Sequence, residues 1–331
     1  MGNANEIESF LLESIRLEKV GDLLPALDQA SLALQQAEND QLQEYFLKAH
    51  TRIAWLLMVL GRYRDALTHA EWVLERSRAT PEVVDALIVK ATCLSETNQL
   101  NQAEPLLQRA VDIGRFIQYK QGLIHGLHNL ANSILLIRGK FSLALAAMEE
   151  AQQIAEDLGE KHWGLPTLKA YVYQITGDRV KLRQALDELV PFAHPGTRLA
   201  GMYYYLWSRL ALDEGDLTQA EEYLRLTIRI ASQTGIPHLQ VWGRIANSLF
   251  FRLKNESASA HGWADNAVVQ AQQTGSDHLL GQALIERAQV EWLQGDLEQT
   301  EKTLLEALHR LKNLRADYDV AVAGFLLCCF Y

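Results

Sequence analysis

Four aromatic side chains stand close together in this sequence, at Tyr203, Tyr204, Tyr205 and Trp207, and form its densest aromatic cluster. Neighbouring residues on a helix point about 100° apart, so these rings cannot all face a core. Counting from the turn at Gly215, we expect Tyr204 to pack inward and Tyr205 to lie on an accessible face. Large accessible aromatics favour peptide or protein recognition, with packing between helices as the alternative for any single ring.

Catalytic and metal-binding patterns are not found. The sequence contains no GxxxxGK[ST] loop, no GxGxxG after a strand, no GxSxG and no HExxH. His125 and His128 have the i, i+3 spacing of two metal ligands, but no Cys or carboxylate accompanies them at ligand spacing. Adjacent cysteines such as Cys328 and Cys329 diverge on a helix and favour core packing over a joint site. We therefore expect no enzyme activity, no cofactor and no metal.

Composition limits the class of protein further. The 331 residues are 48% apolar and 22% charged, which is typical of a folded chain. There are 31 Lys and Arg against 41 Asp and Glu, and this net charge of −10 argues against direct binding of nucleic acid. The start, MGNANEIESF, lacks a signal-peptide pattern, and no run reaches the ~18 apolar residues of a membrane span. With only three cysteines, a disulfide framework is excluded, so we expect a cytoplasmic protein without a membrane partner.

The elements that would position these residues come from an internal repeat. A short tag recurs, made of Gly or Asn, often Asp, then an apolar residue and an Ala three positions later. Successive tags lie 37 to 41 residues apart. They begin at residues 21, 61, 98, 139, 177, 215, 255 and 295. So regular a spacing predicts a stack of like units.

Each unit is predicted to be a helical hairpin. After the tag, small or apolar residues recur four and seven positions on, as at Ala26, Ala30 and Ala33, and share one stripe of a helix. A second periodic segment precedes each tag, and strand signals are nearly absent. Gly suits the left-handed conformation of the turn, and Asp after it in four copies suits a helix N-cap.

Both the end and the middle of the chain depart from this regularity. The apolar run Val320 to Tyr331 is expected to be the first helix of a ninth unit, with its tag due near residue 335. We therefore expect a fragment of a longer protein, with a final cap as the alternative. The fifth unit has large residues on its stripe, at Leu182, Leu186 and Leu189, and two prolines and a glycine in the following loop. Residues 190–197 are thus a possible weak joint with an altered angle between repeats.

The repeat resembles the tetratricopeptide repeat (TPR), whose unit is helix–turn–helix. The turn glycine, the aromatic or apolar residue two positions later and the small residues of the second helix all match; Tyr63 and Phe141 take the aromatic position. The period is near 40 rather than about 34, and the Pro that ends the family's unit is missing. Endings such as IAEDLGEKH, IASQTGIPH and QAQQTGSDH resemble those of the MalT-like branch, found in bacterial regulators, signalling ATPases and sensor enzymes.

The resemblance implies one solenoid over residues 1–331, an all-α, right-handed α-α superhelix of about eight hairpins. First helices would line its inner wall, where a ligand is expected. The residues expected to bind are Asn129, Asn132, Tyr205, Arg209 and Trp242. Two functions remain open. One is a non-catalytic scaffold for a peptide or partner protein; the other is the sensor arm of a larger signalling protein, such as a MalT-like regulator, an ATPase switch, or a cyclase or kinase. In the second case it would bind a small inducer or a C-terminal effector domain of the same polypeptide.

Overall fold

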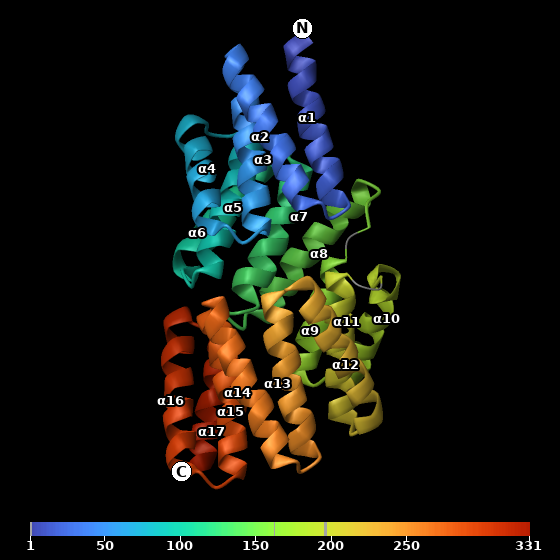
Figure 1. The fold of residues 1–331 in the computed structure, drawn as a ribbon, viewed down its shortest axis with the longest axis vertical. Coiled ribbons are helices and arrows are strands. Elements are labelled where there is room, and N and C mark those ends of the chain that lie inside the picture. The colour runs from blue at the N-terminus through green and yellow to red at the C-terminus, as the bar shows by residue number, and fades with distance from the viewer. Residues whose placement is uncertain (1, 162, 195–196) are drawn as a thin grey trace. The chain divides into compact units, whose positions relative to one another are not determined.

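Helices follow one another as hairpins along the chain in the computed structural model, which describes residues 2–161, 163–194 and 197–331 (Figure 1). Within these ranges there is no strand, so the predicted all-α fold class is confirmed. The first four hairpins comprise α1 (Gly2–Lys19), α2 (Leu23–Asp40), α3 (Gln43–Val59), α4 (Tyr63–Arg76), α5 (Pro81–Glu96), α6 (Leu100–Phe116), α7 (Lys120–Asn129), a π-helical segment (Leu130–Leu135) and α8 (Phe141–Asp157).

The second half continues in the same order. It comprises α9 (Gly164–Thr176), α10 (Arg179–Leu189), a 3-10 turn (Val190–Phe192), α11 (Arg198–Glu214), α12 (Leu217–Thr234), α13 (Pro237–Leu253), α14 (Ser257–Thr274), α15 (Asp277–Leu293), α16 (Leu297–Leu314) and α17 (Asp317–Phe330). The helix α17 covers the apolar run that was expected to begin a ninth unit. No helix among the described residues is long and apolar enough to cross a membrane.

Two compact units make up the described chain. Unit 1 comprises Met1–Ile134 and Gln153–Leu158, and unit 2 comprises Leu135–Gln152 and Gly159–Tyr331. The boundary falls inside the π-helical segment, and α8 contributes residues to both units.

The turns inside the hairpins fall where the tags predict them. All eight tag residues have positive φ: Gly21, Gly61, Asn98, Gly139, Gly177, Gly215, Asn255 and Gly295. Gly has no Cβ penalty in this region, and Asn tolerates it better than most residues. The tags therefore mark a backbone requirement, which explains why only these two residue types occupy the position.

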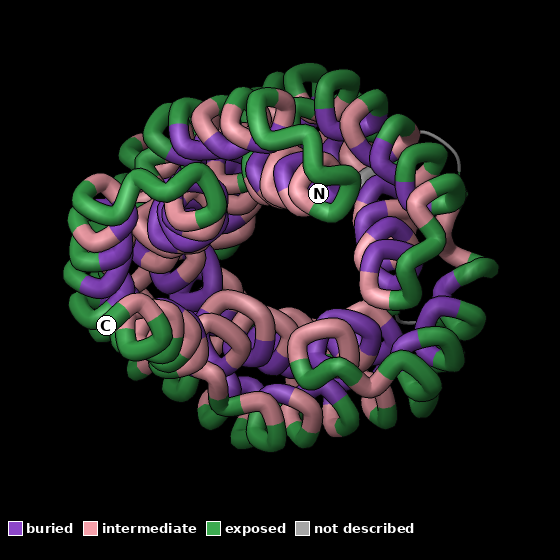
Figure 2. Tube along the Cα trace, turned by 90° about the horizontal axis from the view of Figure 1, so that it is seen from below, coloured by how far each residue is buried: buried purple, intermediate pink, exposed green. Residues whose placement is uncertain are grey.

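The stripe that follows each tag forms the contact between helices. Its three positions in each of the eight hairpins are at most 1% exposed, including Ala144 and Ala220. Figure 2 shows buried positions on the helix faces that meet other helices and exposed positions at the turns and outer faces. Small residues on the stripe allow close approach of a neighbouring helix, as the sequence predicted.

Packing within each unit follows the order of the hairpins. Second helices contact the first helix of the next hairpin, as α12 contacts α13 and α14 contacts α15. First helices also contact one another in succession; in unit 2 these are α9, α11, α13, α15 and α17. We call the surface formed by the first helices of a unit its first-helix face.

The fifth hairpin is shorter than its successor. Its helices α9 and α10 have 13 and 11 residues, whereas α11 and α12 have 17 and 18. In the loop that follows, Pro195 and Gly196 lie outside the described residues. The altered angle between repeats at 190–197 therefore stays a prediction.

Candidate functional site

Polar side chains join consecutive first helices in both units. In unit 1, Trp55 Nε1 donates to Glu18 Oε1 at 2.8 Å, across 37 positions of sequence. In unit 2, Trp242 Nε1 donates to Gln282 Oε1 at 2.9 Å, across 40 positions. Because neighbouring first helices lie side by side, residues about one unit apart come into register. These bonds form a polar ladder on each first-helix face.

In unit 1 this ladder includes Asn129, one of the residues expected to bind a ligand, whereas the bond of Asn132 stays within its own stretch of helix. Asn129 accepts a hydrogen bond from Thr92 at 3.3 Å and donates to the carbonyl of His125 at 2.9 Å. Asn132, within the π-helical segment, donates to the carbonyl of His128 at 3.1 Å. An amide group has two hydrogens, and each of these bonds uses one. Both side chains are half-buried, so each offers polar atoms at the surface of unit 1.

The other expected residues belong to unit 2, where the structure brings two of them into contact. The rings of Tyr205 and Trp242 stack at 5.7 Å with 24° between their planes. Tyr171 of α9 lies 5.1 Å from Trp242, and His238 lies 5.4 Å from it. Trp242 thus gathers aromatic rings from two other first helices, α9 and α11.

Tyr205 is less accessible than the sequence suggested. It is 5% exposed, because the ring of Trp242 from the next first helix covers it. Tyr204, which was expected to pack inward, is half-buried and stacks on Tyr223 of α12 at 6.2 Å. Burial raises the pKa of Tyr205, while the charge of Arg209 lowers it, so the phenol stays neutral near pH 7.

A hydrogen-bonded chain extends from Trp242 to the last helix. Gln282 Nε2 donates to Asp319 Oδ1 at 3.3 Å, and Asp319 Oδ2 lies 2.8 Å from His278 Nε2. Sequence reasoning missed Gln282, His278 and Asp319. Gln282 and His278 lie 37 and 41 positions before Asp319, which matches the spacing of the tags. Polar residues at this spacing could have been used to predict the chain.

Arg209 lies one helical turn after Tyr205 on α11 and is half-buried. Its Nε atom is buried and has no hydrogen-bond partner among the described residues. By contrast, Arg252 of α13 holds Glu286 of α15 through two hydrogen bonds of 2.9 and 3.1 Å. Burial raises the pKa of Glu286, which is 5% exposed, and Arg252 opposes this rise. The protein therefore supplies Arg252 with a hydrogen-bonded carboxylate, whereas Arg209 has none among the described residues.

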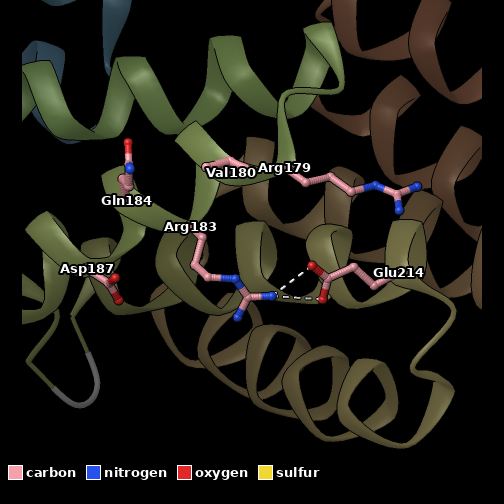
Figure 3. A pocket seen from close by; sticks show the side chains of 6 residues that line it. All are labelled: Arg179, Val180, Arg183, Gln184, Asp187 and Glu214. Carbon is pink, nitrogen blue, oxygen red and sulfur yellow. Dashed lines mark hydrogen bonds and ion pairs between the residues drawn. The ribbon is translucent and has the colours of Figure 1, made fainter.

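An open depression of about 270 Å³ lies beside α10, lined by Arg179, Val180, Arg183, Gln184, Asp187 and Glu214 (Figure 3). Arg183 Nη2 bonds both oxygens of Glu214, at 2.7 and 2.9 Å, and its guanidinium lies 5.4 Å from the ring centre of Trp207. No sequence pattern predicted this depression. Arg183 is already paired with Glu214, and most of the lining residues belong to the second helix α10. The depression is therefore a weaker candidate for a binding site than the first-helix face.

Comparison with known proteins bears on the fold. No protein-family model and no curated protein matches the chain. Among solved structures, a Rap protein in complex with competence and sporulation factor is similar at 11% identity, with a TM-score of 0.59 over 82% of this chain and 78% of that one. The apo form of RapI has 12% identity and a TM-score of 0.42, covering 93% of this chain and 98% of the other.

A tetratricopeptide repeat protein from Parabacteroides merdae also matches, with 12% identity, a TM-score of 0.39, and coverage of 97% and 99% of the two chains. Of these three likenesses, the first is strong enough to compare folds. Together with the hairpins described above, it shows an all-α helical repeat of the tetratricopeptide type.

Proposed function

We propose that this chain is a non-catalytic scaffold that binds a peptide or a partner protein on its first-helix faces. One observation carries the proposal: the first helices present polar and aromatic side chains that are half-buried, at matching positions of successive hairpins. Trp55, Thr92 and Asn129 do so in unit 1, and Trp242 and Gln282 do so in unit 2. A face used only for packing would carry apolar residues there.

The residue types suit recognition of a peptide. Asn129 and Asn132 would hydrogen-bond a peptide backbone, while Trp242 with Tyr205 would give a rigid aromatic contact. Arg209 would bind a polar or charged group. A Rap protein of similar fold was crystallised with competence and sporulation factor, and this supports a scaffold role.

A random peptide library selected on the whole chain tests this proposal. We expect enriched peptides to lose binding to Trp242→Ala or Asn129→Ala, and to keep binding to Val180→Ala, an exposed change on the second helix α10. Each variant must melt like the original chain, so that lost binding reflects the face and not the fold. A library without enriched peptides, or peptides that bind all three variants equally, would refute the proposal.

The finer relationship to the MalT-like branch is also a proposal. Gly159, Gly235 and Gly275 follow the ends of three second helices, each with positive φ, and these glycines belong to the endings that resemble that branch. Under this alternative the chain is the sensor arm of a larger signalling protein and binds a small inducer or its own effector domain. A helix-turn-helix or cyclase sequence beside this region in the natural gene would favour it.

A further inference from the structure

Two arginines of the first-helix faces pair with a glutamate of an adjacent first helix. Arg52 of α3 forms an ion pair with Glu18 of α1, and Arg252 of α13 forms one with Glu286 of α15. In both pairs the partners are 34 positions apart. All four side chains are at most 26% exposed. In these two pairs a guanidinium that is largely buried is matched by a glutamate from an adjacent first helix.

Arg209 has no such partner. The residues 34 positions before and after it are Ile175 and Gly243, and neither carries a carboxylate. One turn beyond Trp242 on α13 stands Ala246, which also offers no acceptor. Consistent with this, Arg209 Nε is buried without a hydrogen-bond partner, and no carboxylate of the described residues forms an ion pair with Arg209.

The acidic groups near Arg209 are committed elsewhere or stand apart. Glu286 is held by Arg252, and Asp319 is held by His278 and Gln282. Asp213 lies one turn after Arg209 on the same helix and forms no ion pair with it, although burial raises the pKa of Asp213 and the charge of Arg209 opposes this rise. The positive charge of Arg209 nevertheless opposes the raised pKa values of Tyr171, Glu286 and Tyr318, which belong to three other helices.

We infer that unit 2 binds a ligand with an oxyanion, a carboxylate or a phosphate, next to an aromatic ring: Arg209 holds the oxyanion and the ring lies at Trp242. A half-buried charge without an ion-pair partner destabilises the protein, and a bound oxyanion reduces that penalty. The planar guanidinium holds a carboxylate or phosphate through two parallel hydrogen bonds. Half-buried Trp242 stacks on Tyr205, one turn from Arg209, so both contacts come from one short stretch of the face. This inference rests on the proposed function and names the chemistry of its ligand.

Matched small probes test the inference on the whole chain. N-acetylphenylalanine carries the carboxylate, N-acetylphenylalaninamide is its neutral counterpart, and phenyl phosphate carries the other oxyanion. Binding is measured by calorimetry or by saturation-transfer NMR. We expect the carboxylate or the phosphate to bind at least about tenfold more tightly than the amide, and this preference to fall as salt is added. The oxyanion probe that binds more tightly shows whether the site prefers a carboxylate or a phosphate.

Variants then assign the preference to Arg209. Arg209→Gln should abolish it, whereas Arg183→Gln, which removes a paired arginine on α10, should leave it unchanged. Asp213→Asn should preserve or strengthen it. Should Arg209→Gln not fold, Arg209→Lys keeps the charge but loses the planar fork, so the preference should weaken.

The inference would be overturned if neither the carboxylate nor the phosphate bound more tightly than the amide, if none of the three probes bound, or if a preference survived in Arg209→Gln. Loss of the preference in Asp213→Asn would also overturn it, because the oxyanion would then depend on Asp213. Library peptides that bind while the probes show no preference would leave the proposed function intact and reject only the role of Arg209.

Discussion

Single alanines decide how closely the helices approach. Ala144 and Ala220 are 0% exposed on the stripes of α8 and α12. Replacing either by Trp should overpack the contact and lower the free energy of unfolding by about 1–3 kcal/mol or more. Urea denaturation measures this, with the exposed neighbours as controls: Leu143→Trp and Glu221→Trp should change stability little. Unchanged midpoints for both alanine variants would contradict the register of the stripes.

Two histidines of unit 1, His50 and His69, lie in contact and make stability depend on pH. Nδ1 of His50 lies 2.8 Å from Nδ1 of His69, and the ring of His50 stacks on Trp72 at 3.9 Å. Burial, followed by the charges of His69 and Arg76, lowers the pKa of His50 from 6.5 to about 4. Between these values the unfolded chain binds a proton that the folded chain does not, so the contribution of His50 to stability is lost as pH falls.

We therefore expect the free energy of unfolding to fall more steeply between pH 6.5 and about 4 in the original chain than in His50→Phe. Burial raises the pKa of Asp85 to about 7, which has the opposite sign, but this group is common to both proteins and cancels in the difference. His309→Phe changes an exposed histidine and should keep the original slope. Parallel pH profiles for the original chain and His50→Phe would disprove this assignment.

At the scale of elements, the aspartates after the turn glycines differ in a way that the sequence does not show. Asp178, Asp216 and Asp296 each accept a hydrogen bond from the amide three residues later, whereas Asp22 does not. Asp216→Ala should therefore cost about 0.5–2 kcal/mol of stability, and Asp22→Ala distinctly less. Chemical denaturation of the two variants tests this. An equal loss of stability in both variants would mean that the cap hydrogen bond does not explain the stabilising effect of Asp216.

Local sequence patterns predicted the helices and turns. The features that they did not predict depend on contacts between hairpins. The turns follow from Gly and Asn at positive φ, and the second helices follow from buried stripes. The π-helical segment at Leu130–Leu135 and the unit boundary inside it follow from no local pattern. At the candidate site, helical register predicted Tyr205, Arg209 and Trp242. It did not predict that Trp242 would bury Tyr205, because that depends on the distance between α11 and α13.

At the scale of the whole molecule, unit 2 contains a contact that a simple stack of hairpins does not predict. Repeats normally contact only their neighbours. Yet Tyr318 of α17 donates to the carbonyl of Ile175 on α9 at 3.4 Å, across 143 positions. Its ring lies 5.6 Å from that of Phe141, and a Cβ added to Gly139 would lie 3.1 Å from Tyr318 Cβ and 3.2 Å from its backbone N. The ninth first helix is thereby joined to the fourth and fifth hairpins.

This contact should couple the local stability of segments that are distant in sequence. Tyr318→Ala removes the ring and the hydroxyl, so amide exchange should become faster in α17 and also around Gly139–Phe141 and the end of α9. Tyr318→Phe keeps the ring against Phe141 and should give a smaller effect. The matched control is Phe325→Ala on the same helix, where the side chain is 68% exposed and the exchange of α9 should not change. Hydrogen exchange with mass spectrometry resolves these segments. If faster exchange in Tyr318→Ala stayed within α17, the contact would not couple the ends of unit 2. The stability of each hairpin in unit 2 would then depend only on its neighbours, as in an open stack.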